Sequence, residues 1–147
     1  MTSIPSLDYR AARAAADHAA AAALDAGLGM TVVVVDAAGL ERVRLRLDGG
    51  SIASATLAGQ KAMTALTTRT ATADWVRLLA ERPAVGPSVG AFPAFCCIPG
   101  GVPINVEGQV IGAVGVSGGT FDQDQAIAEA AAAHAAQSIA VERTVSL

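Results

Sequence analysis

The sequence is poor in charged residues and has no excess of basic ones. Of its 147 residues 16% are charged, and the formal net charge at pH 7 is −3. Nucleic-acid binding requires a basic stripe that neutralises phosphates, so we expect no nucleic-acid partner. No apolar run reaches the roughly 18 residues of a membrane span, and residues 1–5 lack the basic and apolar regions of a secretory signal. We therefore expect a cytoplasmic protein that does not bind membranes.

Aromatic residues and cysteines are also scarce. Aromatics make up 3% of the chain, so the core must be built from alanine, valine, leucine and isoleucine. The only two cysteines are the neighbours Cys96 and Cys97. Adjacent cysteines rarely pair with each other and two thiols alone form no metal site, which agrees with a reducing cytoplasm. We expect both thiols to be inert.

Hydrophobic residues, by contrast, are abundant. They form 52% of the chain, and many of them are alanines. This content is high for a soluble monomer, and an apolar surplus favours burial of surface between subunits. We therefore expect a homo-oligomer. The length is that of one domain, and we expect a single domain over residues 1–147.

The pattern of apolar and breaker residues predicts helices alternating with strand pairs. Ser6 is the expected N-cap of the first helix, Ile52 an expected core residue, and Thr72 the expected cap of a short helix. Thr120 and Gln123 have the spacing of a capping box at the start of the last helix. The expected elements are a helix at 7–26, strands at 30–35 and 40–47, helices at 51–68 and 72–81, a loop at 83–101, a hairpin of 102–106 with 109–116, and a final helix. This order predicts an α/β (α+β) fold in which helices pack on an antiparallel sheet.

Residues 40–47 alternate between two faces, with arginines on one of them. Arg42, Arg44 and Arg46 share a face, and apolar residues occupy the other. A guanidinium pairs bidentately with a carboxylate, so three on one strand can hold a multiply anionic ligand. The alternative is a solvated edge strand or a set of salt bridges between subunits.

Glycine-rich segments in the C-terminal half carry a resemblance to a known family. Gly100-Gly101-Val102-Pro103-Ile104, the run 108–119 and Asp122-Gln123-Asp124 resemble the GlcG/HbpS family of haem-binding-protein-like domains, which also occur in PduO-type proteins. The resemblance covers about residues 30–131. It implies a profilin-like sandwich, assembly into homo-oligomers, and binding of haem or another tetrapyrrole. Arg46 and Lys61 match the family pattern. Arginines replace residues that are usually apolar in the family at positions 42 and 44, which favours a smaller and more acidic ligand.

The same glycine segments are candidate ligand contacts. Glycine lets backbone N–H groups approach a ligand, and a helix N-terminus favours an anion. We therefore place a ligand-binding wall at Gly100, Gly101, Ser117, Gly118 and Gly119. The alternative is that these glycines only make tight turns.

Lys61 and His18 are the remaining candidates. Lys61 is the only lysine of the chain, and a lysine that shifts its pKa on burial can serve as a base. With Asp48 and Arg46 nearby it would form a catalytic set; the alternative is an ion pair with Asp48 or with a neighbouring subunit. His18 projects onto an apolar helix stripe and is the candidate haem-iron ligand. The alternative is a packed, hydrogen-bonded histidine.

Three functions remain open from the sequence. The first is an oligomeric protein that binds haem or another anionic, partly apolar small molecule. The second is a cofactor-independent isomerase, lyase or cyclase acting on a small acid, with Lys61 as base and the arginines and backbone amides holding an oxyanion. The third is a structural subunit with no ligand.

Overall fold

The computed structural model describes residues 3–145, and their side chains up to residue 139. Five α-helices, one short 3₁₀-helix and four strands follow one another in these residues. Their bounds are α1 Tyr9–Asp25, β1 Thr31–Asp36, β2 Glu41–Arg46, α2 Ile52–Thr68, α3 Thr72–Glu81, η1 Pro83–Val85, α4 Gly86–Gly90, β3 Gly101–Val106, β4 Gln109–Ser117 and α5 Phe121–Val145. None of the helices described is long and apolar enough to cross a membrane.

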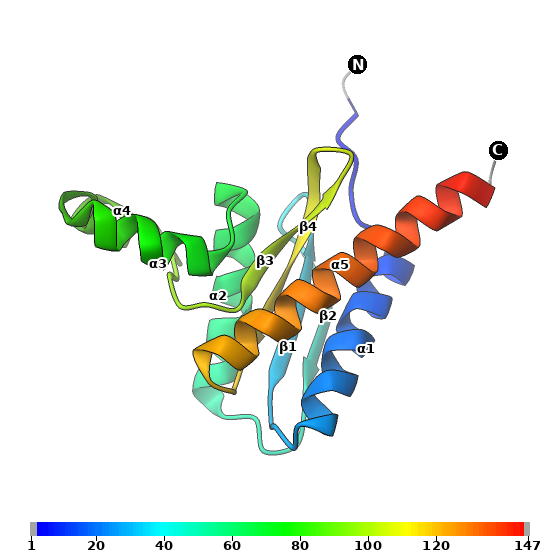
Figure 1. Ribbon diagram of the computed structural model, residues 1–147, viewed down its shortest axis with the longest axis horizontal. Helices are drawn as coiled ribbons and strands as arrows, with labels where there is room; N and C mark the ends of the chain where they lie inside the picture. The colour runs from blue at the N-terminus through cyan, green and yellow to red at the C-terminus, as the bar shows by residue number, and fades with distance from the viewer. Residues whose placement is uncertain (1–2, 146–147) are drawn as a thin grey trace.

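The four strands form one sheet in the order β2-β1-β4-β3, and every neighbouring pair is antiparallel. Helices α1 and α5 cover one face of the sheet, and α2 covers the other (Figure 1). The expected α+β sandwich with an antiparallel sheet between helices is therefore confirmed.

The larger core lies between the sheet and the pair α1 and α5. The buried positions of α1 are all alanines, which lets the two helices lie close to each other and to the sheet. Valines on alternate positions of β1 and β4 complete this core, because successive side chains of a strand point to opposite faces. The scarcity of aromatics is thus matched by a core of small side chains.

The smaller core lies between the sheet and α2, and a glycine sets its spacing. A Cβ added at Gly115 would lie 1.9 Å from the carbonyl oxygen of Ala58, so only glycine lets the helix rest on β4. Ala58 and Ala62 of α2 pack there against Val33 and Ala113 of the strands.

Helices α3 and α4 form an arm that projects beside the sheet (Figure 1). The expected loop at 83–101 is wrong in part, because η1 and α4 occupy its first half. Pro83 and Pro87 stand in the first turns of these two short helices, where a missing N–H costs nothing. We call residues 72–90 the arm.

The first residues of three helices differ from what the sequence predicts. The N-cap of α1 is Asp8 instead of Ser6, and Asp8 accepts a bond from the amide of Ala11. Ile52 is wrong as a core residue, because it is 90% exposed at the first position of α2. Thr72 is the first residue of α3 and not its cap, which is Ala71.

The capping box at the start of α5 is confirmed. The amide of Gln123 donates to the hydroxyl of Thr120 at 3.2 Å, and the amide of Thr120 donates to the side-chain oxygen of Gln123 at 2.9 Å. The hairpin of β3 and β4 also turns where expected, at Glu107 and Gly108, which both have positive φ.

Candidate functional site

The arginines of β2 lie on one face of an edge strand, as the alternation predicts. Each of them is bonded to a different partner. Arg42 donates to the Asp36 carboxylate at 2.8 Å, and Arg46 donates to the carbonyl oxygen of Gly50 at 3.1 Å. Arg44 donates to both carboxylate oxygens of Glu41 and to a backbone carbonyl of α2. The three guanidinium groups therefore do not converge on one point.

Arg44 lines a surface groove between β2 and α2, which we call the β2–α2 groove. Its volume is about 540 Å³, within the usual range for small-molecule sites. The lining residues are Val35, Gly39, Glu41, Arg44, Ala55, Thr56, Gly59, Gln60, Met63 and Ala94. The walls are therefore mainly apolar, with one anion and one cation.

The position of Arg44 depends on a glycine of α2. A Cβ at Gly59 would lie 3.1 Å from Nη2 of Arg44, so the missing side chain leaves room for the guanidinium over the helix. The hydrogen bond with Glu41 raises the pKa of Arg44, which therefore stays cationic at any physiological pH. A ligand carboxylate that replaced Glu41 would meet the same donors.

Lys61 lies away from this groove, at a buried junction of α2, β4 and α5. Its side chain is almost completely buried, and its Nζ donates to the Asp124 carboxylate and to the carbonyl oxygen of Val116, both at 2.9 Å. The other oxygen of Asp124 accepts the amide of Gly119 at 2.8 Å. The ammonium and the carboxylate are thus each bonded to a backbone group as well as to each other.

The predicted glycine wall is part of this junction. A Cβ at Gly100 would lie 2.4 Å from the carbonyl oxygen of Val116, and one at Gly101 would lie 2.3 Å from that of Lys61. At Gly118 it would lie 2.6 Å from the carbonyl oxygen of Gly29. Protein backbone therefore stands where a ligand would have to approach these glycines. We call Lys61, Asp124 and the glycines 100, 101, 115, 118 and 119 the glycine–lysine junction.

The structure does not assemble the predicted set of Lys61, Asp48 and Arg46. No hydrogen bond or ion pair joins these three side chains in the described residues, and Asp48 is exposed in the turn after β2. The expected partner Asp48 is replaced by Asp124, which the sequence indicates only as part of a family motif and not as a partner of Lys61. Its position in the first turn of a helix, after the Ser-Gly-Gly segment, was the available signal, because helix N-termini favour carboxylates.

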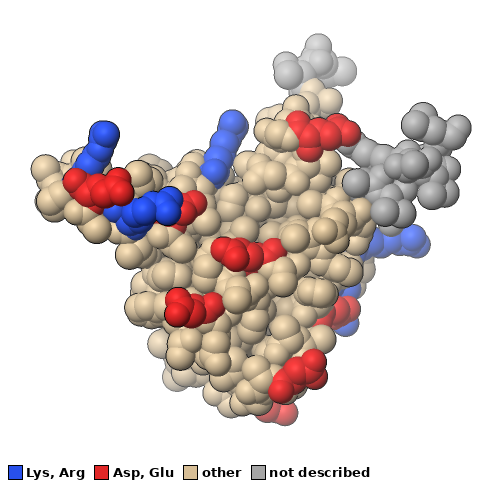
Figure 2. All heavy atoms as spheres, viewed as in Figure 1, with Lys and Arg blue, Asp and Glu red and all other residues tan. Residues whose placement is uncertain are grey.

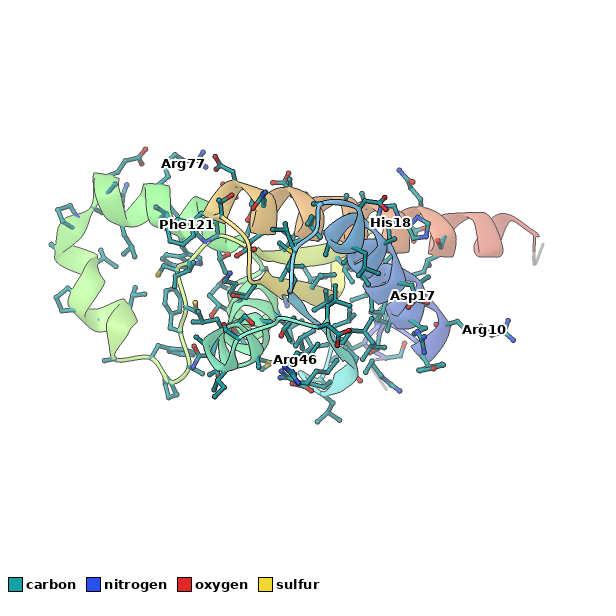
Figure 3. All side chains as sticks on the ribbon, turned by 90° about the horizontal axis from the view of Figure 1, so that it is seen from below. Arg10, Asp17, His18, Arg46, Arg77 and Phe121 are labelled. Atoms are coloured by element: carbon teal, nitrogen blue, oxygen red, sulfur yellow. The ribbon has the colours of Figure 1, made fainter. Side chains whose placement is uncertain are left out.

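His18 lies on the opposite side of the sheet from Arg46 (Figure 3). Its ring stacks on that of His134 from α5, with centroids 4.5 Å apart and planes inclined by 12°. His18 is exposed and does not belong to the buried alanine stripe of α1, contrary to the helical projection. Among the described residues no group of three or more His, Cys, Asp or Glu side chains could hold a metal ion.

The two cysteines are free thiols in the segment that leads from the arm to β3. Cys96 is buried, and its amide donates to the hydroxyl of Thr64 at 2.9 Å. Burial, and to a lesser extent Cys96, raises the pKa of the Cys97 thiol. A protonated thiol is a poor nucleophile, in agreement with the inert role expected from the sequence.

A four-stranded antiparallel sheet between helices, with a groove at one edge strand, defines a small protein of the α+β class. The sequence matches the family described as "Haem degrading protein HbpS-like" over residues 7–133. The chain therefore belongs to the HbpS-like family, as its glycine motifs indicate.

Solved structures of relatives share the fold. A double mutant of HbpS from Streptomyces reticuli is 33% identical with a TM-score of 0.83, and the match covers 90% of this chain and 89% of that one. A complex of PduOC with heme is 29% identical with a TM-score of 0.79, over 88% of this chain and 94% of that one. A sequence relative from Citrobacter freundii, "Uncharacterized 15.0 kDa protein in dhaT-dhaS intergenic region", is 32% identical over 87% of this chain and 91% of its own length.

Proposed function

We propose that the protein binds an anionic, partly apolar small molecule in the β2–α2 groove, and that haem is the first ligand to test. The observation that carries this proposal is the placement of the Arg44 guanidinium in a mainly apolar groove of about 540 Å³. An apolar body and a carboxylate on one ligand match these two properties. A relative with the same fold that forms a complex with heme supports the choice of haem.

The groove offers haem a carboxylate partner and an apolar wall. Arg44 would exchange Glu41 for a propionate, and Ala55, Met63 and Ala94 would contact the macrocycle. The thioether of Met63 is the soft donor among the lining residues and would be the candidate donor to the haem iron. Bound haem would supply an iron centre with a strong Soret absorption. His18 lies across the sheet from this groove, so ligation by His18 would define a different site.

The enzyme alternative assigns Lys61 the role of a base, and no feature of the structure favours it. The Lys61 ammonium is buried and held by Asp124 and a backbone carbonyl. A base must lose its proton and reach a substrate. Our proposal therefore gives Lys61, Asp48 and Arg46 no catalytic role.

We also propose that the protein forms a homo-oligomer. The support is the high apolar content of the chain, together with large apolar side chains that are exposed at several places on its surface. They include Ile4, Tyr9, Leu24, Leu40, Ile52 and Phe121. Sedimentation velocity over a range of protein concentrations tests this part, and a monomer at every concentration would overturn it.

A haemin titration tests the ligand proposal. We expect a saturable shift of the Soret band with the wild-type protein, and a dissociation constant about tenfold or more higher for Arg44→Gln, because a charge-assisted hydrogen bond is lost. Arg77→Gln is the matched control, since Arg77 also pairs with an acidic residue three positions away but lies on the arm.

The titration separates the alternatives through two further results. If His18→Ala abolishes the Soret shift while Arg44→Gln leaves it unchanged, the ligand lies on the α1–α5 side and our groove is wrong. If haemin gives no saturable shift, haem is not the ligand, and a thermal-shift comparison of wild type and Arg44→Gln with small apolar carboxylic acids tests the wider class.

A further inference from the structure

A second cavity lies where the arm meets the end of α2. Its volume is about 330 Å³, at the lower end of the range for small-molecule sites. It is lined by Thr67, Thr68, Trp75, Ser88, Val89, Phe92 and Phe95. We call it the aromatic pocket. It shares no lining residue with the β2–α2 groove.

The walls of this pocket are held in place by hydrogen bonds. The indole Nε1 of Trp75 donates to the hydroxyl of Thr68 at 3.0 Å, which fixes the ring over α2. The amide of Cys96 donates to the hydroxyl of Thr64 at 2.9 Å and anchors the segment that carries Phe95. Phe95 meets Trp75 edge to face, with centroids 5.2 Å apart. Trp75 and Phe95 are thus held in place before a ligand binds, which lowers the entropic cost of binding.

The chemistry of the lining residues determines which class of ligand the aromatic pocket can bind. None of the seven lining residues is charged, so an ionised ligand would lose hydration without gaining a partner. The hydroxyls of Thr67 and Thr68 already donate to backbone carbonyls of α2. Phe92 is 57% exposed at this pocket, and a bound aromatic ring would cover it.

We propose that the aromatic pocket binds a neutral aromatic molecule between Trp75, Phe92 and Phe95. Rings prefer offset or edge-to-face contact with aromatic walls, and the Trp75–Phe95 pair presents such walls. The ligand class differs from the anion of the β2–α2 groove in charge, because that groove contains Arg44 and this pocket contains no ion. Binding at this second site does not depend on haem binding in the groove.

Trp75 provides a direct readout, because it is the only tryptophan in the chain. We would titrate the protein with N-phenylnaphthylamine, which is neutral, and measure energy transfer from Trp75. Anilinonaphthalene sulfonate has the same rings with an added anion. We expect saturable transfer with the neutral probe and at least about tenfold weaker binding of the sulfonate, because the pocket offers it no cation.

Substitutions in the aromatic pocket test whether the neutral probe binds there. Phe92→Ser should weaken binding of the neutral probe about tenfold by removing one aromatic wall, and Ser88→Phe should block it by filling the cavity. Both positions are exposed, so the fold should persist, which circular dichroism checks. Val76→Ser is the control, because Val76 is 46% exposed on α3 but does not line the pocket.

Three results would overturn the proposal. The first is equal binding of the two probes, and the second is binding that survives both pocket variants. The third is energy transfer from Trp75 that disappears as the protein self-associates, which would make the pocket an interface between copies. Arg44→Gln should leave transfer from Trp75 unchanged, and Phe92→Ser should leave the haemin titration unchanged. The two sites can therefore fail separately.

Discussion

The glycine–lysine junction and the β2–α2 groove are both rich in residue types that bind anions, but they differ in what surrounds those residues. In the junction, the Lys61 ammonium bonds to Asp124 and to the carbonyl oxygen of Val116, and protein atoms fill the space beside each glycine. In the groove, Arg44 bonds to Glu41 at the surface, beside open volume. Over α5, the face drawn in Figure 2 carries a few separate acidic side chains, whereas basic side chains lie on the arm and toward the edges of the view.

This difference shows that residue type alone does not separate a binding site from a packing site. A cation whose donors are bonded to buried protein atoms holds the fold together, whereas a cation paired with an exposed carboxylate can exchange that partner. The junction should therefore control stability, and the groove should control ligand affinity. Substitutions in the two regions should therefore have different effects.

The largest effect is expected for Gly115→Ala in the junction. The added Cβ would lie 1.9 Å from the carbonyl oxygen of Ala58, a backbone atom that cannot move unless α2 leaves the sheet. We expect this variant to lose its cooperative thermal unfolding transition. Gly86→Ala is the control, because nothing lies within 4 Å of its Cβ position, and it should unfold like the wild type. A normal transition for Gly115→Ala would show that α2 is not tightly seated.

A smaller but still large loss of stability is expected for Lys61→Met. The change leaves the buried Asp124 carboxylate without its cation, which typically costs about 3–5 kcal/mol. Denaturant unfolding measures this loss. The double variant Lys61→Met with Asp124→Leu should recover much of it, since no unpaired charge remains. A loss below about 1 kcal/mol for the single variant would mean that the pair is solvated.

Gly59→Ala in the groove is also a glycine-to-alanine substitution, but we expect it to raise the stability of the protein instead of lowering it. Gly59 lies in the interior of α2, where alanine is more favourable than glycine by up to about 1 kcal/mol. The atom nearest to the new methyl group, Nη2 of Arg44 at 3.1 Å, is the end of a flexible side chain. We expect slightly higher stability together with weaker haemin binding, measured by unfolding and by Soret titration. Unchanged haemin affinity would place the ligand elsewhere.

Much of the fold could be predicted from the sequence, because local patterns determine it. The β-branched run of β1, the alternation in β2 and the capping box at Thr120 and Gln123 all lie within a few residues of the contacts they specify. The structure of the arm was harder to predict, because a segment rich in proline and glycine is typical of a loop. Two short helices nevertheless form within it.

The candidate site was less predictable, because it depends on contacts between distant segments. Lys61 and Asp124 are separated by 63 positions, and no local pattern pairs them. The same holds for Arg44 and Gly59, which meet only because α2 crosses beside β2. The sequence identifies the family and the charged residues, and the packing of α2 decides which of them remain available to a ligand.

The smallest effect is expected at Cys97, which lies between the two regions in the segment before β3. Burial raises the pKa of its thiol, so at pH 8 a smaller fraction is thiolate than for a free cysteine. We expect iodoacetamide to alkylate Cys97 more slowly than a free thiol at pH 8 and to reach the free-thiol rate after unfolding, as site-resolved mass spectrometry can measure. Because the pKa is raised in the folded state, this group contributes stability below the unfolded pKa and loses it as the pH rises through the folded one. Faster alkylation than a free thiol at pH 7 would instead indicate an activated thiolate, and the segment before β3 would then need a chemical role beside its structural one.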